Sequence, residues 1–310
     1  MLHLVKDMVL KMKINNIYEE YINFTPLSPR TKELYINVYN NFWKKEIGNL
    51  QLKDLNYTIF QNGINKLVTK YNYNTVKIYK NAMFKFIEIA EAINTDFKFA
   101  GKKSIYIGKP IKKNGFNPNT LQEFYDLIEH TSNSASKYKK QFITALWIGF
   151  FTGMRVGEVF NLTVKDINFK KGEIYINKAK TPNGIRTVYM CKELKTILKI
   201  YTNNIEKGYL FKNKNGEKLK TTKISSYIRN FAKPRGYTIH FHTLRELFVK
   251  TMLDNGASIE SVRVLLGHAN TSVTLNIYLK TNTEEIKKDL FNVYNNINFR
   301  KKYIIKNKKA

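Results

Sequence analysis

The chain contains a single cysteine, Cys191, among its 310 residues, which excludes an internal disulfide framework. Acidic residues are also scarce, because 24 Asp and Glu stand against 53 Lys and Arg. No apolar run reaches the roughly 18 residues that a membrane-spanning helix requires. Clusters typical of metal sites, such as CxxC, HExxH and DxD, do not occur, so no metal or other cofactor is expected.

The imbalance of charge points to a polyanionic partner. The formal net charge is +29, far beyond what solubility requires. Nucleic acid is the first candidate partner and an anionic membrane surface the second. The start of the chain has no cleavage-site pattern, and the lone cysteine fits a reducing compartment, so we expect a cytoplasmic, nucleoid-associated protein.

The first third of the chain predicts a small helical domain over residues 15–96, preceded by a basic extension over 1–14. One helix is expected to begin at Ser28 and Pro29, a cap and a first-turn residue. Two more are expected over 57–68 and 74–92. The lysines of this domain form either a solvated face or contacts with a phosphate backbone.

Residues 97–118 differ in composition from both neighbours, since they are rich in Gly, Pro and Lys and contain no acidic residue. We interpret them as a basic linker, which is either a simple tether or a segment that lies along a phosphate backbone.

A second, larger domain is expected over 119–285, with a basic tail over 286–310. Thr120 and Glu123 are typical of a capping box. The almost wholly apolar stretch 142–151 predicts a helix that is buried on all sides. Period-two patterning then predicts three short strands over 166–169, 174–177 and 185–189. The predicted fold class is therefore mostly α with a small antiparallel β-sheet.

Two arginines lie in distinctive surroundings. Arg155 follows Gly153, which is expected to end the apolar helix, and Glu158 one turn later is expected to hold it by an ion pair. His242 and Arg245 are three residues apart, so a helix places them on one face. Guanidinium groups are planar, permanently charged and able to bind two phosphate oxygens at once, so Arg155 and Arg245 are candidate phosphate ligands.

The segment LLGHANTSVTLNIY adds a histidine and a tyrosine. Gly267 is expected to end a short helix and to leave His268 on a turn, and Tyr278 follows ten residues later. Two Arg, two His and one Tyr are sufficient to hold a phosphodiester and to attack it without a metal.

TGMRVGE, HTLR and LLGHANTSVTLNIY, in this order, resemble the catalytic boxes of the tyrosine recombinase (phage integrase) family, which includes Xer-like enzymes. The resemblance covers the chain from about residue 15 onward. It implies that 15–96 is a helical domain that grips core DNA, that 119–285 is the catalytic domain, and that 286–310 contacts a neighbouring subunit. Glu246 is a departure, because the family more often has a basic or polar residue there.

The resemblance also assigns roles to the candidate residues. Tyr278 is the expected nucleophile, which keeps the cut end attached as a phosphotyrosine so that rejoining needs no ATP. His242 is expected to exchange a proton with Tyr278, and His268 to donate a hydrogen bond to a phosphate oxygen. In the family a hairpin lysine protonates the leaving 5′ oxygen, and Lys180 in KTPNG matches it, with Lys178 as the alternative.

The implied function is that of a site-specific DNA recombinase or integrase, of the kind that a mobile genetic element carries, which cleaves and rejoins double-stranded DNA through a 3′-phosphotyrosine. Its implied partners are a core recombination site and copies of itself, as a tetramer on two DNA sites. The alternatives are a type IB-like topoisomerase and a catalytically silent DNA-binding protein of the same fold. The DNA sequence, the outcome (integration, excision, inversion or dimer resolution) and the delivery of Tyr278 in cis or in trans stay open.

Overall fold

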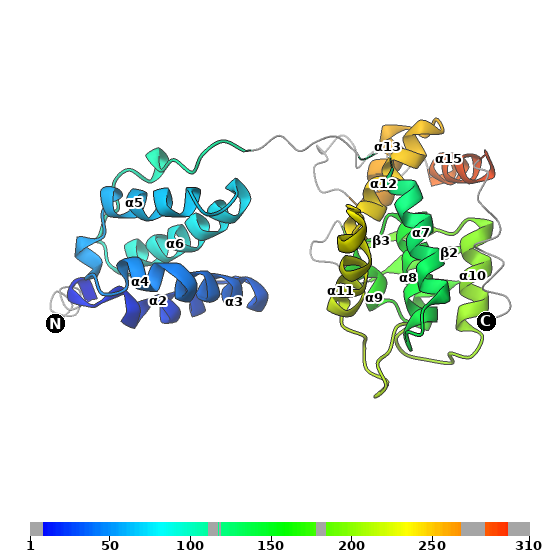
Figure 1. Ribbon diagram of the computed structural model, residues 1–310, viewed down its shortest axis with the longest axis horizontal. Helices are drawn as coiled ribbons and strands as arrows, with labels where there is room; N and C mark the ends of the chain where they lie inside the picture. The colour runs from blue at the N-terminus through cyan, green and yellow to red at the C-terminus, as the bar shows by residue number, and fades with distance from the viewer. Residues whose placement is uncertain (1–8, 111–116, 118, 178–183, 268–282, 297–310) are drawn as a thin grey trace. The chain divides into compact units, whose positions relative to one another are not determined.

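The computed structural model describes residues 9–110, 117, 119–177, 184–267 and 283–296, and the chain divides into two compact units, 1–113 and 114–310 (Figure 1). Each unit has its own cluster of buried apolar side chains. Both are mostly helical, and the second contains a small antiparallel sheet, as the sequence predicts. No helix among the described residues is both long enough and apolar enough to cross a membrane.

The first unit is a bundle of helices around a core of large aromatic and aliphatic side chains. Trp43 is fully buried, stacks on Phe60 with ring centroids 4.9 Å apart, and donates a hydrogen bond to the Tyr79 carbonyl at 3.1 Å. The principal elements are α2 (Ile14–Asn23), α3 (Pro29–Val38), a π-helical turn (Tyr39–Trp43), α4 (Lys44–Ile47), α5 (Tyr57–Val68) and α6 (Tyr73–Ile93).

Side chains that directly precede α3 and α6 cap the first turns of these helices. The Ser28 hydroxyl accepts a hydrogen bond from the Thr31 backbone N–H, and Pro29 occupies the first turn, which confirms the predicted start of α3. Asn72 caps α6 in the same way, because its side-chain oxygen accepts from the Thr75 N–H. Such caps satisfy N–H groups that have no partner inside the helix.

The beginning of the expected linker is part of the first unit. Four apolar side chains between residues 97 and 107 are buried in its core: Phe97, Phe99, Ile105 and Ile107. Lys102 forms an ion pair with Glu91 of α6. The basic, glycine-containing composition suggested a tether, but these four apolar side chains pack against the bundle.

The second unit is arranged around α8 (Lys139–Thr152), whose residues 142–152 are all buried. This helix contacts α7, α9, α10 and α12, which explains why its sequence is apolar on every side (Figure 1). The other α-helices among the described residues of this unit are α7 (Thr120–Asn133), α9 (Val156–Asn161), α10 (Lys192–Thr202), α11 (Thr221–Ala232), α12 (Phe241–Asp254), α13 (Ile259–Leu266) and α15 (Thr283–Asn296).

The sheet has the order β1-β2-β3, with β1 (Ile167–Asn168), β2 (Glu173–Ile176) and β3 (Arg186–Tyr189) all antiparallel. In the register of the β2–β3 pair, Ile174 lies opposite Val188 and Ile176 lies opposite Arg186. Ile174, Ile176 and Val188 are buried. Because side chains on a strand alternate between faces, Arg186 shares the buried face of the sheet with Val188.

The capping box predicted at Thr120 and Glu123 is wrong. Asn119 precedes α7 and makes no side-chain cap hydrogen bond. The Glu123 carboxylate instead accepts from the Asn117 side-chain amide at 3.0 Å and from the Thr238 backbone N–H at 3.1 Å. These donors lie outside the helix, one of them 115 residues away in sequence, so tertiary contacts replace the local reciprocal bond.

Helix α15 packs against α12 and α13 of its own chain. The Tyr294 hydroxyl is buried and donates to the Phe151 carbonyl at 2.9 Å, and the Asp289 carboxylate accepts from the Ser258 N–H and the Ser261 hydroxyl at the start of α13. Part of the stretch 286–310, which we expected to contact a neighbouring subunit, is therefore integrated into the second unit.

Candidate active site

Arg155 lies at a sharp turn between two helices. Helix α8 ends at Thr152, and Gly153 follows with a φ of +62°, a left-handed conformation that favours glycine. A Cβ on Gly153 would lie 2.7 Å from Phe248 and 2.8 Å from Leu266, so space as well as conformation requires glycine. The predicted helix end at Gly153 is confirmed, and Arg155 then directly precedes α9.

Glu158 holds Arg155 from the first turn of α9. Its carboxylate accepts from the Arg155 backbone N–H at 2.9 Å and from Arg155 Nη1 at 2.9 Å, which confirms the predicted ion pair. The Glu158 side chain is 5% exposed, whereas the Arg155 side chain is 45% exposed. Arg155 is thus anchored on one side and open to solvent on the other.

Arg245 projects from α12 into the interior and is 4% exposed. Its Nη1 donates to the Gly153 carbonyl at 2.8 Å, and its Nη2 donates to the Leu266 carbonyl at 2.7 Å. Burial, followed by the positive charges of Arg155 and Arg186, lowers the pKa of Arg245 to about 10. The guanidinium is therefore held by neutral carbonyl groups in a region already rich in positive charge.

A third arginine, Arg186, belongs to the same cluster and was not among the candidates from the sequence. It begins β3 and pairs with Glu158, with Nη2 3.1 Å from Oε2 and Nη1 3.3 Å from Oε1. A signal was present: Arg186 lies two residues before the buried Val188, so period-two alternation places a charge on the buried face. A buried arginine needs a carboxylate partner, and Glu158 is that partner.

The carboxylate of Glu158 is therefore shared by two guanidinium groups. Burial raises the pKa of Glu158, but the hydrogen bond and charge of Arg186, followed by those of Arg155, hold it below its ordinary value. Glu158 is ionised at neutral pH. Among the described residues it is the one carboxylate that forms ion pairs with these arginines.

The last turn of α13 supplies the remaining partners. The carbonyl of Leu265 accepts from Arg186 Nε at 2.8 Å, and the adjacent carbonyl of Leu266 accepts from Arg245. The final carbonyl groups of a helix have no partner within the helix and carry partial negative charge. Gly267 follows with a φ of +61° and ends α13, as predicted.

The arginine cluster, defined as Arg155, Arg186 and Arg245, carries excess charge. Three guanidinium groups against one carboxylate leave a formal charge of 3 − 1 = +2. Two of the three side chains are largely buried, at 4% and 8% exposure. Uncompensated buried charge is costly, and an anion with several oxygen atoms would relieve the cost by accepting charge-assisted hydrogen bonds.

Of the other candidate residues, the structure describes His242 alone. His242 lies one turn before Arg245 on α12, and its side chain is exposed, with its ring centroid 6.3 Å from that of His240. Lys180, the alternative Lys178, His268 and Tyr278 lie outside the described residues. The structure thus brings together Arg155 and Arg245 and adds Arg186 and Glu158.

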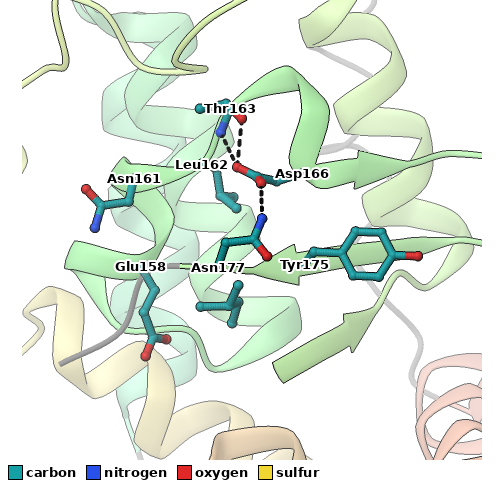
Figure 2. Close-up of a pocket in the computed structure, with 8 residues that line it drawn as sticks. Glu158, Asn161, Leu162, Thr163, Asp166, Tyr175 and Asn177 are labelled. Atoms are coloured by element: carbon teal, nitrogen blue, oxygen red, sulfur yellow. Dashed lines mark hydrogen bonds between the residues drawn. The ribbon is translucent and has the colours of Figure 1, made fainter. Parts of the chain in front are cut away.

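A small pocket lies beside the cluster, between α9 and the sheet, and Glu158 forms part of its lining. Figure 2 shows that the Glu158 side chain points away from Asp166, whose carboxylate accepts from Thr163 and Asn177 instead. The second acidic group of the pocket is therefore engaged locally and does not neutralise the arginine cluster.

The chain is similar to known proteins over most of its length. The family model described as the phage integrase family matches residues 114–285. The chain is 26% identical to a tyrosine recombinase XerC-like protein of Caldanaerobacter subterraneus, over 85% of this chain and 78% of that protein. It is 31% identical to tyrosine recombinase XerA of Pyrococcus furiosus, over 64% of this chain and 70% of that protein.

Solved structures of integrases share the fold. The Tn1549 transposon integrase, solved in complex with transposon right end DNA, superposes with a TM-score of 0.65 at 16% identity and covers 89% of this chain and 99% of its own. A lambda integrase tetramer bound to a Holliday junction gives a TM-score of 0.66 at 16% identity, over 84% of this chain and 77% of its own. At this level of identity the likeness establishes the fold.

Proposed function

Because the chain belongs to the phage integrase family and is a DNA recombinase of the tyrosine recombinase class, we propose that it cleaves and rejoins DNA strands through a 3′-phosphotyrosine intermediate. The observation that carries the proposal is the arginine cluster with its formal charge of 3 − 1 = +2. A DNA phosphodiester is the anion that a recombinase must hold. In-line attack on it increases the negative charge on the non-bridging oxygens, and the cluster would stabilise that charge.

The two arginines that the sequence identifies have complementary properties for this task. Arg245 is buried and fixed by two carbonyl groups, so it would present its remaining N–H groups in one orientation. Arg155 has an exposed face and would approach the phosphate from the solvent side. Removal of one such preorganised donor is expected to slow cleavage by about 10²–10³-fold.

The chemical step assigns one role to each remaining candidate. The Tyr278 oxygen attacks phosphorus as its proton passes to His242, and the bond from phosphorus to the 5′ oxygen breaks. Lys180 donates a proton to that 5′ oxygen, or Lys178 does so. His268 donates a hydrogen bond to a non-bridging oxygen. Attack by the freed 5′ hydroxyl reverses the step and rejoins the strand, so the bond energy is conserved and ATP is not consumed.

The proposed partner is double-stranded DNA. The solved neighbours include integrases in complexes with DNA and a tetramer on a Holliday junction, and we propose the same arrangement here: four protomers on two core sites. The net charge of +29 supports strong, salt-dependent binding to the phosphate backbone.

Trapping of the covalent intermediate tests the proposal. The full chain is incubated with a pool of random-sequence duplexes that each carry a nick, so that the short fragment released by cleavage diffuses away and rejoining stops. Denaturing gels should show a protein–DNA adduct for the wild type and for the control Tyr303→Phe, but none for Tyr278→Phe. An adduct formed by Tyr278→Phe would assign the nucleophile elsewhere, and no adduct from the wild type would reject the mechanism.

A further inference from the structure

We infer that Arg186 is a positioning residue of the recombinase site: it fixes Arg155 through Glu158 and fixes Arg245 through the last turn of α13. This inference rests on the proposed function of the arginine cluster. Arg186 makes four hydrogen bonds to three separate segments, namely two to Glu158, one to the Leu265 carbonyl and one to the Gly184 carbonyl.

Arg186 acts through its neighbours because four of the five N–H groups of its guanidinium already donate hydrogen bonds within the protein. A guanidinium has five N–H groups. Nε donates to Leu265, Nη1 to Gly184 and Glu158, and Nη2 to Glu158. The side chain is 8% exposed, compared with 45% for Arg155. Arg245 donates two hydrogen bonds and the Arg155 guanidinium donates one, so a phosphate would bind to the N–H groups left on these two arginines and not to Arg186.

The first coupling runs through the shared carboxylate. The two Glu158 oxygens accept from Arg186 on one side and from the Arg155 backbone and side chain on the other. Arg186 donates to both oxygens of this buried carboxylate, so it sets the direction of the carboxylate and hence of Arg155. The guanidinium of Arg186 is planar and donates to both carboxylate oxygens, so it fixes the orientation of Glu158, which a point charge would not do.

The second coupling runs through the end of α13. Arg186 holds the Leu265 carbonyl and Arg245 holds the next one, Leu266, so two arginines from different elements grip successive residues of the same turn. A shift of this turn would move one of the two carbonyl groups that fix Arg245. In sequence the same turn directly precedes Gly267 and His268, and Gly184 directly follows the segment that carries Lys180.

Single-turnover cleavage of the nicked duplexes separates positioning from folding. Arg186→Lys retains the positive charge but loses the planar, bidentate guanidinium, and Arg186→Met removes both. The rate constant should fall by about 10²-fold for each variant, as expected when reacting groups are misplaced by about 1 Å. The dissociation constant for DNA, measured on the same duplexes without cleavage in the Tyr278→Phe background, should change by less than about threefold because Arg155 and Arg245 retain their charges.

The matched control is Tyr201→Phe, which removes a hydrogen bond to the Leu210 carbonyl in the same unit. It should lower stability with an unchanged rate constant. A variant that only fails to fold lowers the reaction amplitude and not the rate constant, so partial unfolding of Arg186→Met leaves the test intact. Full restoration of the rate by Arg186→Lys, or a wild-type rate constant in Arg186→Met, would overturn the inference.

A double-mutant cycle with Glu158→Gln tests the first coupling directly. If Arg186 acts through Glu158, the double variant Glu158→Gln/Arg186→Met should be no more than about threefold slower than the slower single variant. Multiplicative losses would instead show two independent contributions and would reject the coupling. Absence of any adduct from the wild type would reject the proposed function itself, whereas an active wild type with unimpaired Arg186 variants would reject the positioning role alone.

Discussion

Replacement of Glu158 by glutamine tests most directly the interpretation that the negative charge of Glu158 holds Arg155 and Arg186 in place. The side chain is 5% exposed and its oxygens lie 2.9, 3.1 and 3.3 Å from the guanidinium nitrogens of Arg155 and Arg186. Removal of one partner from a buried ion pair costs about 3–5 kcal/mol. Glutamine retains one acceptor oxygen and nearly the same volume, so we expect a loss of about 3 kcal/mol, at the lower end of that range.

Activity should respond differently from stability. Glu158→Gln raises the formal charge of the site from 3 − 1 = +2 to +3, so the variant should bind DNA at least as tightly as the wild type. Cleavage should nevertheless slow by about 10–10²-fold, because Arg155 loses the carboxylate that orients it. A variant that binds DNA as tightly as the wild type but cleaves it slowly would show that Arg155 keeps its charge but is misplaced.

The pH dependence has a defined sign. The pKa of Glu158 in the folded protein lies below its ordinary value, so its ion pairs stabilise the fold fully above the unfolded-state pKa. That stabilisation is lost as the pH falls through the folded-state pKa. The difference in unfolding free energy between wild type and Glu158→Gln should therefore be largest near neutral pH and shrink as the pH falls below about 4.5.

The assay can be confined to the second unit. The chain has two tryptophans, Trp43 in the first unit and Trp147 in the second, so in a Trp43→Phe background the fluorescence of Trp147 reports urea unfolding of the second unit. Glu246→Gln is the matched control, since it removes the same charge from an exposed position of α12. A Glu158→Gln cost below about 1 kcal/mol, or one independent of pH, would refute the reasoning.

Three further outcomes follow from described contacts. Gly153→Ala should destabilise the second unit by about 2–4 kcal/mol, because φ is +62° and the new methyl group meets Phe248. The control Gly157→Ala, whose methyl group meets nothing within 4 Å, should change stability by less than about 1 kcal/mol in the same Trp147 assay. Sodium sulfate should raise the melting temperature of the wild type more than that of Arg245→Met, because a bound sulfate compensates the buried positive charge of Arg245. Equal shifts of the two melting temperatures in calorimetry would contradict an anion site. Asp289→Asn should cost about 1 kcal/mol by weakening the contacts that start α13, and an unchanged urea midpoint would contradict that role.

The sequence was sufficient for features that depend on local patterns. The buried helix α8, the glycine ends at Gly153 and Gly267 and the three strands follow from periodicity and backbone preference. The ion pair between Arg155 and Glu158 follows from their spacing of three residues, which here joins the residue before α9 to the first turn of that helix.

Features that depend on distant segments were missed. Glu123 matches a capping pattern but bonds to Thr238, because the fold brings a better donor to it. Arg186 was overlooked since its partners are 28 and 79 residues away, and no spacing rule connects a strand arginine to a helix end. Residues 97–107 have a linker-like composition, yet their apolar side chains complete the first core.

The manner in which Arg186 and Arg245 are fixed has a consequence for the enzyme before DNA arrives. Three of their anchors are peptide oxygens at the ends of α8 and α13, which carry only fractional negative charge. Carboxylates at those points would grip the arginines equally well but would also cancel the attraction for a polyanion. The free enzyme should therefore attract small anions from solution to this spot, and their release into bulk solvent would add a favourable entropy to the binding of DNA.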